Sequence, residues 1–191
     1  MKTPTLLSGL ASLTFLGSIF VPVQAQRPTI NKPNANLVAA IRSTIGQELG
    51  QEYSQPDSWE RTTYHFTEID LNNDGNKEVI VGIKHGYFCN NRHCPVYIYQ
   101  QERNSGNYHL VSSIFTSHHG LEVAVLDSRS HGWLNLASIV FTYEPREEAW
   151  RVFQFDDTNY ELTPQKLSSA PNHIVLEETT STEFNLADPG E

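Results

Sequence analysis

The sequence predicts an α+β domain in which one N-terminal amphipathic helix packs on an antiparallel β-sheet of about eight short strands. Two observations favour this class. Apolar residues recur at helical spacing on one face of residues 35–49, namely Leu37, Val38, Ile41, Ile45 and Leu49. From residue 62 onward the pattern changes to short segments rich in β-branched and aromatic residues, separated by turn signals such as Asn73-Asp74-Gly75.

Residues 1–25 have the features of a secretory signal peptide. Lys2 supplies a positive start, residues 6–23 are mostly apolar or small, and Val23-Gln24-Ala25 fits the small-x-small cleavage rule. Serine, glycine and proline residues interrupt the apolar run, which disfavours a permanent membrane span. We therefore expect cleavage after Ala25 and a secreted or periplasmic mature protein.

The order of elements follows from the same patterns. Residues 26–34 contain two prolines and little apolar content, so we predict a flexible lead-in. The predicted helix stops at Gly50, and a polar connector follows to residue 61. The predicted strands are 62–69, 78–84, 95–101, 108–115, 121–126, 133–142, 150–155 and 160–162. We expect residues 35–176 to form a single domain and residues 177–191 to form a disordered acidic tail.

An internal repeat suggests a variant of this fold. Residues 70–79 can be aligned with residues 127–136. The first Asp, the glycine and a residue with a side-chain oxygen at the ninth position then coincide. Each segment follows one predicted strand and opens another. This repeat would give two four-stranded, blade-like units, the second with Arg129 and His131 in place of cation ligands.

Charge and hydropathy restrict the partners. The chain has 191 residues and a net charge of −9, and loss of Lys2 with the leader makes it one unit more negative. This acidity argues against nucleic acid, whose phosphates need a lysine and arginine surface. No second apolar stretch is long enough to cross a bilayer, so we expect no membrane span in the mature form. The expected partner is a protein or envelope component. The sequence identifies neither this partner nor the oligomeric state.

The segment DLNNDGNKE, residues 70–78, carries the clearest chemistry. Oxygen side chains occupy loop positions one, three, five and nine, and Gly75 permits the sharp turn that aims them inward. Ca²⁺ takes about 6–8 oxygen ligands, which such a loop supplies. The predicted ligands are Asp70, Asn72, Asp74, Asn76 through its backbone carbonyl, and Glu78. The alternative is a hairpin turn without an ion, since Asn, Asp and Gly form turns unaided.

The surroundings of this loop distinguish it from a helix–loop–helix calcium sensor. Position twelve is Val81 where a sensor has an acidic ligand, and residues 79–83 are strand-like. Over about residues 62–101 the chain instead resembles FG-GAP/VCBS-type repeats, as found in exported bacterial domains of unknown function, with matches at Asp70, Asn72, Asp74, Gly75 and Glu78. That resemblance implies a structural calcium ion in a β-rich unit, although two blades are too few for a closed propeller.

Cys89 and Cys94 are the two cysteines of the chain, and an even count in an exported protein favours a disulfide. Four intervening residues suit a bridge that closes the hairpin between segments 78–84 and 95–101. The alternative is a zinc site formed with His85 and His93, but this spacing matches no standard zinc pattern.

Catalytic signatures are missing from the sequence, which has no G-x-S-x-G elbow, no H-E-x-x-H helix and no phosphate-binding glycine loop. His118-His119 precedes Gly120, so we expect an exposed polar turn. On a strand, adjacent histidines would point to opposite faces and would not easily bind one metal. Several acidic residues could pair as glycosidase carboxylates do, but nothing in their spacing distinguishes them from a solvated surface: Glu144, Glu147, Glu148, Asp156 and Asp157.

The sequence therefore favours an exported, non-catalytic binding or interaction protein, stabilised by calcium and one disulfide. One alternative is a periplasmic enzyme inhibitor or immunity-type protein whose acidic surface binds a basic enzyme. A second alternative is a metal-dependent hydrolase, which requires His118, His119 or His131 to meet a carboxylate in a concave site.

Overall fold

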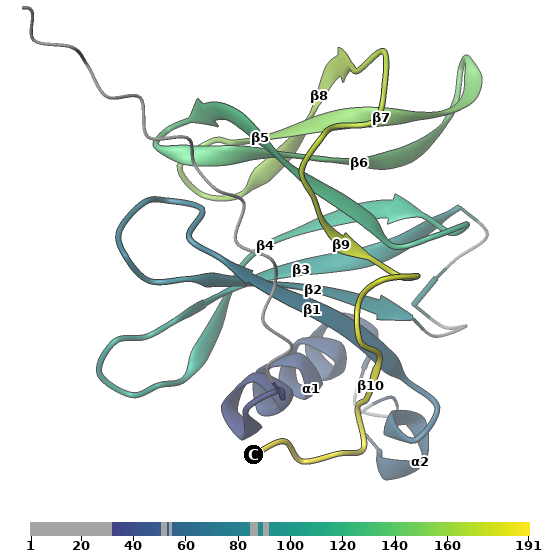
Figure 1. The fold of residues 1–191 in the computed structure, drawn as a ribbon. Coiled ribbons are helices and arrows are strands. Elements are labelled where there is room, and N and C mark those ends of the chain that lie inside the picture. Colours follow the sequence, from purple (N-terminus) through teal and green to yellow (C-terminus); the bar gives the residue numbers. More distant parts are fainter. Residues whose placement is uncertain (1–31, 51–52, 54, 85–87, 90–91) are drawn as a thin grey trace, which may run out of the picture.

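The computed structural model describes residues 32–50, 53, 55–84, 88–89 and 92–191. The predicted signal peptide and residues 26–31 of the lead-in lie outside these residues. Two antiparallel five-stranded sheets pack face to face, and helix α1 (Ala35–Leu49) lies against the outer face of the first sheet (Figure 1). A short helix, α2 (Pro56–Trp59), precedes the first strand.

The first sheet has the strand order β10-β1-β2-β3-β4. Its strands are β1 (Thr63–Ile69), β2 (Glu78–Lys84), β3 (His93–Gln101), β4 (Tyr108–Ser117) and β10 (Phe184–Asn185). The strands β1 to β4 form an antiparallel meander. The C-terminal strand β10 joins at the edge of β1, where Thr63 pairs with Asn185.

The second sheet has the order β8-β7-β6-β5-β9 and repeats this arrangement. Its strands are β5 (Glu122–Ser130), β6 (Trp133–Tyr143), β7 (Arg146–Phe155), β8 (Tyr160–Lys166) and β9 (Ile174–Glu177). Again four consecutive strands form a meander, and a later strand pairs with the first of them, here Leu176 of β9 with Val123 of β5. The β4–β5 turn is the connection between the two meanders.

Strand alternation divides the apolar residues of the first sheet between two cores. One face packs into the sandwich, where Ile80, Val96 and Ile98 share a buried cluster with Val123 and Phe153 of the second sheet. The other face packs against the apolar stripe of α1, in a cluster that joins Val79, Val81, Tyr97 and Tyr99 to Leu37, Val38, Ile41 and Ile45. The strand β2 is therefore buried on both faces.

Helix α1 has the predicted bounds. The Asn34 side chain accepts the Leu37 N–H at 2.9 Å and caps the first turn. Gly50 follows the last turn with a φ of +103°, a conformation that glycine adopts without strain. Among the described residues, no helix is long and apolar enough to span a membrane.

The predicted α+β class is wrong. Of the residues that the structure describes, 50% lie in strands and 13% in helices, and the strands form two sheets where one was expected. The variant with two four-stranded, blade-like units is wrong as well, because β9 and β10 give each sheet a fifth strand. Helical periodicity in one segment is a strong local signal. The pairing of distant strands and the packing of two sheets leave no comparable local pattern.

The C-terminal residues 177–191 differ from the disordered tail that the sequence predicts. The backbone of Leu186 donates to the Thr62 carbonyl at 2.9 Å, and the Leu186 side chain is fully buried against α1. The guanidinium of Arg42 in α1 donates to the carbonyls of Leu186 and Ala187. A polar segment becomes ordered here because its backbone groups bond to β1 and α1 and one leucine fills a core position.

Candidate metal centres

Residues 70–78, which we call the Asp-rich loop, connect β1 to β2 and include the first residue of β2. Its side-chain oxygens accept hydrogen bonds from the backbone of the loop itself: Asp70 Oδ2 from Gly75 N–H at 3.0 Å, Asn72 Oδ1 from Asp74 N–H at 2.9 Å and Asp74 Oδ1 from Asn76 N–H at 2.8 Å. Gly75 has a φ of +86°. These bonds hold three oxygen side chains on one turn. Asp70 Oδ2 and Asn72 Oδ1 each keep a second lone pair for a cation, whereas Asp74 Oδ1 also accepts from Asn76 Nδ2 at 2.9 Å.

Glu78 occupies the ninth loop position and is 0% exposed. Its Oε2 accepts the Leu71 N–H at 2.8 Å, and its Oε1 accepts from Gln100 Nε2 at 3.0 Å and from Asn72 Nδ2 at 3.4 Å. Burial raises the pKa of the Glu78 carboxyl, while the hydrogen bonds from Leu71 and Gln100 act in the opposite direction. A bound cation would stabilise the ionised form of this buried acid.

Arg103 pairs with the exposed side of the same loop. Its Nη2 lies 3.4 Å from Asp74 Oδ2 and donates to the Asp74 carbonyl at 3.3 Å. The hydrogen bond from the Asn76 backbone, and then this arginine among smaller contributions, lower the pKa of Asp74. Because the Arg103 side chain is exposed, a divalent ion would displace it at little cost.

The Asp-rich loop also contacts the second sheet. Leu71 is fully buried in the sandwich core. Its carbonyl accepts the Leu134 N–H at 2.8 Å and Arg129 Nη1 at 3.0 Å. A change in the loop backbone is therefore transmitted directly to the start of β6 and to the contact between the sheets.

The structure brings the predicted calcium ligands together in one loop, without gathering their carboxylates around a common point. Among the described His, Cys, Asp and Glu residues, three ligand atoms within 4.8 Å of one another occur at His118, His119 and Glu148. Glu78 directs its oxygens to N–H donors beneath the loop. Calcium coordination by Asp70, Asn72, Asp74, Asn76 and Glu78 therefore requires the Glu78 carboxylate to rotate toward the turn, where Asn72 Oδ1 already lies.

The segment that aligns with this loop in sequence, residues 127–136, has a different backbone conformation. Its first four residues belong to β5, and Ser130 pairs with Trp133 across a turn made by His131 and Gly132. Asn135, at the ninth position, is buried and donates to the Ser128 hydroxyl at 2.9 Å. This segment forms a tight hairpin that lacks the spacious turn of the Asp-rich loop.

The predicted disulfide between Cys89 and Cys94 is present. The two sulfurs bond to each other, so neither is a thiolate ligand for the alternative zinc site, and His85 lies outside the described residues. A cavity of about 220 Å³ adjoins the bridge. Its lining includes Lys84, His118 and Leu121. Glu178 also lines the cavity and forms an ion pair with Lys84.

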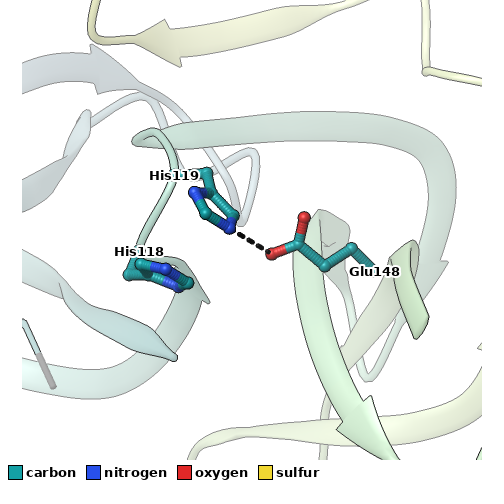
Figure 2. A group of neighbouring side chains, drawn as sticks. All are labelled: His118, His119 and Glu148. Carbon is teal, nitrogen blue, oxygen red and sulfur yellow. Dashed lines mark ion pairs between the residues drawn. The ribbon is translucent and has the colours of Figure 1, made fainter. Parts of the chain in front are cut away.

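His118, His119 and Glu148, which we call the His–His–Glu cluster, converge from two parts of the fold (Figure 2). The histidines form the turn after β4, and Glu148 lies near the start of β7. The imidazole rings lie 3.7 Å apart between centroids, and His119 Nε2 lies 3.7 Å from Glu148 Oε1. All three residues are exposed.

The exposed turn predicted for His118-His119 is present, but the rings do not diverge as they would on a strand. The hydrolase alternative required a carboxylate near one of these histidines, but no sequence pattern identified Glu148 as that carboxylate. The adjacent histidines, His118 and His119, were a sequence signal from which part of the cluster could have been predicted. The partner was not identifiable, because its proximity depends on how β7 packs beside the β4–β5 turn.

A second exposed pair, His131 and Asp157, joins two hairpin tips of the second sheet. His131 Nδ1 lies 2.6 Å from Asp157 Oδ2. Both residues have positive φ, 48° and 87°. This pair has one imidazole and one carboxylate, which is fewer ligands than a stable metal site needs.

Comparison with protein-family models, with curated proteins and with solved structures found no match to this chain.

Proposed function

We propose that this chain is an exported, non-catalytic binding protein whose β-sandwich is stabilised by Ca²⁺ at the Asp-rich loop and by the Cys89–Cys94 disulfide. The observation that carries the proposal is the fully buried Glu78 carboxylate beneath a turn that holds three oxygen side chains. Hard cations take carboxylate, amide and carbonyl oxygens at this spacing.

Electrostatics favour a cation at this loop. Asp70, Asp74 and Glu78 place three carboxyl groups within one short segment, and both aspartates raise the pKa of Glu78. A divalent ion would offset this repulsion and the cost of burying Glu78. Since Leu71 bonds to β6, the same ion would also stiffen the contact between the two sheets.

The position of the loop argues for a structural ion. Glu78 is the first residue of β2, and Lys84, which lines the cavity, is the last. An extended strand of this length separates the two by roughly 20 Å. A substrate in the cavity would therefore be remote from an ion at the loop, so the ion supports binding through the fold and not through catalysis.

The disulfide and the leader support export. Disulfides persist in oxidising compartments, which are also those reached through a signal peptide. Expression of the full chain should yield a product that begins at Gln26. A product that keeps residues 1–25 would contradict the export part of the proposal.

Thermal unfolding of the mature protein tests the calcium part. We expect millimolar Ca²⁺ to raise the melting temperature above its value in EDTA, and Asp70→Asn to remove the shift. Asp127→Asn is the matched control, because Asp127 is exposed and occupies the equivalent position in the aligned segment, residues 127–136. Equal melting temperatures of the wild type in EDTA and in Ca²⁺ would overturn the calcium assignment.

Capture from an envelope fraction tests the binding part. We expect a discrete partner that the wild type retains in Ca²⁺ and releases in EDTA, while Asp70→Asn fails to retain it. Turnover of a peptide, ester or glycoside panel that disappears in His119→Ala would instead assign a metal-dependent hydrolase.

A further inference from the structure

We propose that the His–His–Glu cluster binds a divalent transition-metal ion, with Zn²⁺ as the representative ion, through His118, His119 and Glu148. Two imidazoles and one carboxylate match the ligand sets of zinc sites that keep a fourth position open. Imidazole nitrogen prefers zinc, copper or nickel over calcium. The cluster therefore selects a different class of ion from the Asp-rich loop.

The distances suit this class of ion. Ligand atoms from all three residues lie within 4.8 Å of one another. Zinc bonds of about 2.0–2.1 Å in a tetrahedron separate neighbouring ligand atoms by about 3.4 Å. His119 Nε2 and Glu148 Oε1, at 3.7 Å, are already near this separation. Small rotations of these exposed side chains would bring all three ligand atoms to this separation, and exposed side chains rotate with little steric resistance.

A buried hydroxyl holds the cluster in place. Ser117, the last residue of β4, is 2% exposed. Its Oγ donates to Glu148 Oε1 and accepts the His119 N–H at 3.3 Å. One side chain thus positions both the turn and the carboxylate. Hydrogen bonds of this kind orient ligating carboxylates in metal sites.

The backbone of the turn is held as well. His118 N–H donates to the Arg92 carbonyl at 3.0 Å, which joins the turn to a residue between the two bonded cysteines. Thr116 Oγ1, which is buried, donates to the Gly120 carbonyl at 3.3 Å. The turn that carries the two histidines is therefore held by hydrogen bonds, and its backbone loses little conformational freedom when a metal binds.

The cluster lies at the opposite end of the first sheet from the Asp-rich loop. Glu78 pairs with Gln100, which pairs with His109 of β4, whereas Ser117 ends β4. The extended strand between His109 and Ser117 spans roughly 26 Å. A Zn²⁺ ion in the cluster would tie β7 to the β4–β5 turn, the connection between the two meanders, and would leave one coordination position to water or an external ligand.

Isothermal titration of the untagged mature protein with Zn²⁺, in buffer that contains Ca²⁺, tests the assignment. We expect one Zn²⁺ per chain in the wild type and loss of that site in His119→Ala and Glu148→Gln. Ser117→Ala should weaken binding about tenfold without changing the stoichiometry, because it removes only the positioning hydroxyl. His109→Ala and Glu144→Gln are the matched controls, since both residues are exposed and lie outside the cluster.

Cu²⁺ electron paramagnetic resonance identifies the ligands directly. We expect nitrogen hyperfine coupling from two imidazoles in the wild type and from one in His118→Ala or His119→Ala. Circular dichroism of each variant verifies that it is folded before titration. Absence of Zn²⁺ binding to the wild type at millimolar concentration, or binding that His119→Ala and Glu148→Gln leave unchanged, would overturn the proposal.

Discussion

The carboxylate of Glu78 and the backbone N–H of Leu71 form a hydrogen bond of 2.8 Å inside the sandwich, where both residues are fully buried. This bond closes the base of the Asp-rich loop. Because Leu71 also accepts the Leu134 N–H, the loop, the first sheet and the second sheet meet at these two residues. The charge of Glu78 is therefore linked to the stability of the whole sandwich.

We expect Glu78→Gln to lose its stabilisation by calcium. A ligand at about 100 times its Kd adds about 2.7 kcal/mol to the free energy of unfolding. The wild type should gain this amount in urea unfolding with Ca²⁺, and Glu78→Gln should gain none. Glu102→Gln, a substitution at an exposed turn position, should behave as the wild type does. A full calcium gain in Glu78→Gln would exclude Glu78 as a ligand.

His65 should make the protein less stable in mild acid. It is 1% exposed, its Nδ1 donates to the Ser181 carbonyl at 3.2 Å, and burial lowers its pKa below 6.5 although Glu183 acts in the opposite direction. The unfolded chain therefore takes up the proton more readily than the folded chain. The stability contribution is complete above about pH 6.5 and is lost as the pH falls below it.

Urea unfolding at about pH 7 and about pH 5 measures this effect. We expect the decrease in unfolding free energy to be smaller in His65→Gln, whose side-chain amide still donates a hydrogen bond. His109→Gln is the control, because His109 is exposed. An identical decrease in His65→Gln and the wild type would show that another group causes the acid sensitivity.

Leu186→Ala should destabilise the protein by about 2–4 kcal/mol, the cost of truncating a buried leucine. Leu186 is 0% exposed and belongs to the cluster beneath α1. Ala187→Ser, at the exposed neighbouring position, should have little effect on chemical denaturation. If residues 177–191 were disordered, both substitutions would leave the unfolding free energy unchanged.

Gly82→Ala should destabilise the sandwich by about 1–3 kcal/mol through overpacking. A Cβ at this position would lie 3.0 Å from Leu121 Cδ1 and 3.1 Å from Leu176 Cδ2. Trimming one neighbour in the double variant Gly82→Ala/Leu176→Val should recover part of the loss in thermal melts. A single variant as stable as the wild type would show that these leucines move away without cost.

Reduction of Cys89–Cys94 should lower the unfolding free energy by no more than about 2 kcal/mol, because the bridge closes a short loop. The double variant Cys89→Ser/Cys94→Ser should match the reduced wild type in the same assay. Complete unfolding on reduction would contradict this modest role and would indicate that the sandwich depends on the bridge.

Local patterns predicted the parts of the fold that local interactions specify. The apolar stripe from Leu37 to Ile45 predicted α1 at its observed bounds, and the β-branched segment 78–84 predicted β2. The pairing of Cys89 with Cys94 was predictable because the residues are close in sequence. The Asp-rich loop was recognisable because its oxygen side chains follow one another along a single turn, and calcium binding there stays a prediction.

The sequence by itself determined these neighbouring contacts, since helical periodicity, strand alternation and turn residues act over a few positions. The tertiary structure alone decided that the strands form two sheets, that β9 and β10 pair with β5 and β1, and that Leu186 enters the core. It also decided that Glu148 meets His118 and His119. Those contacts join distant segments, and their formation depends on strand register and sheet packing, which no single segment encodes.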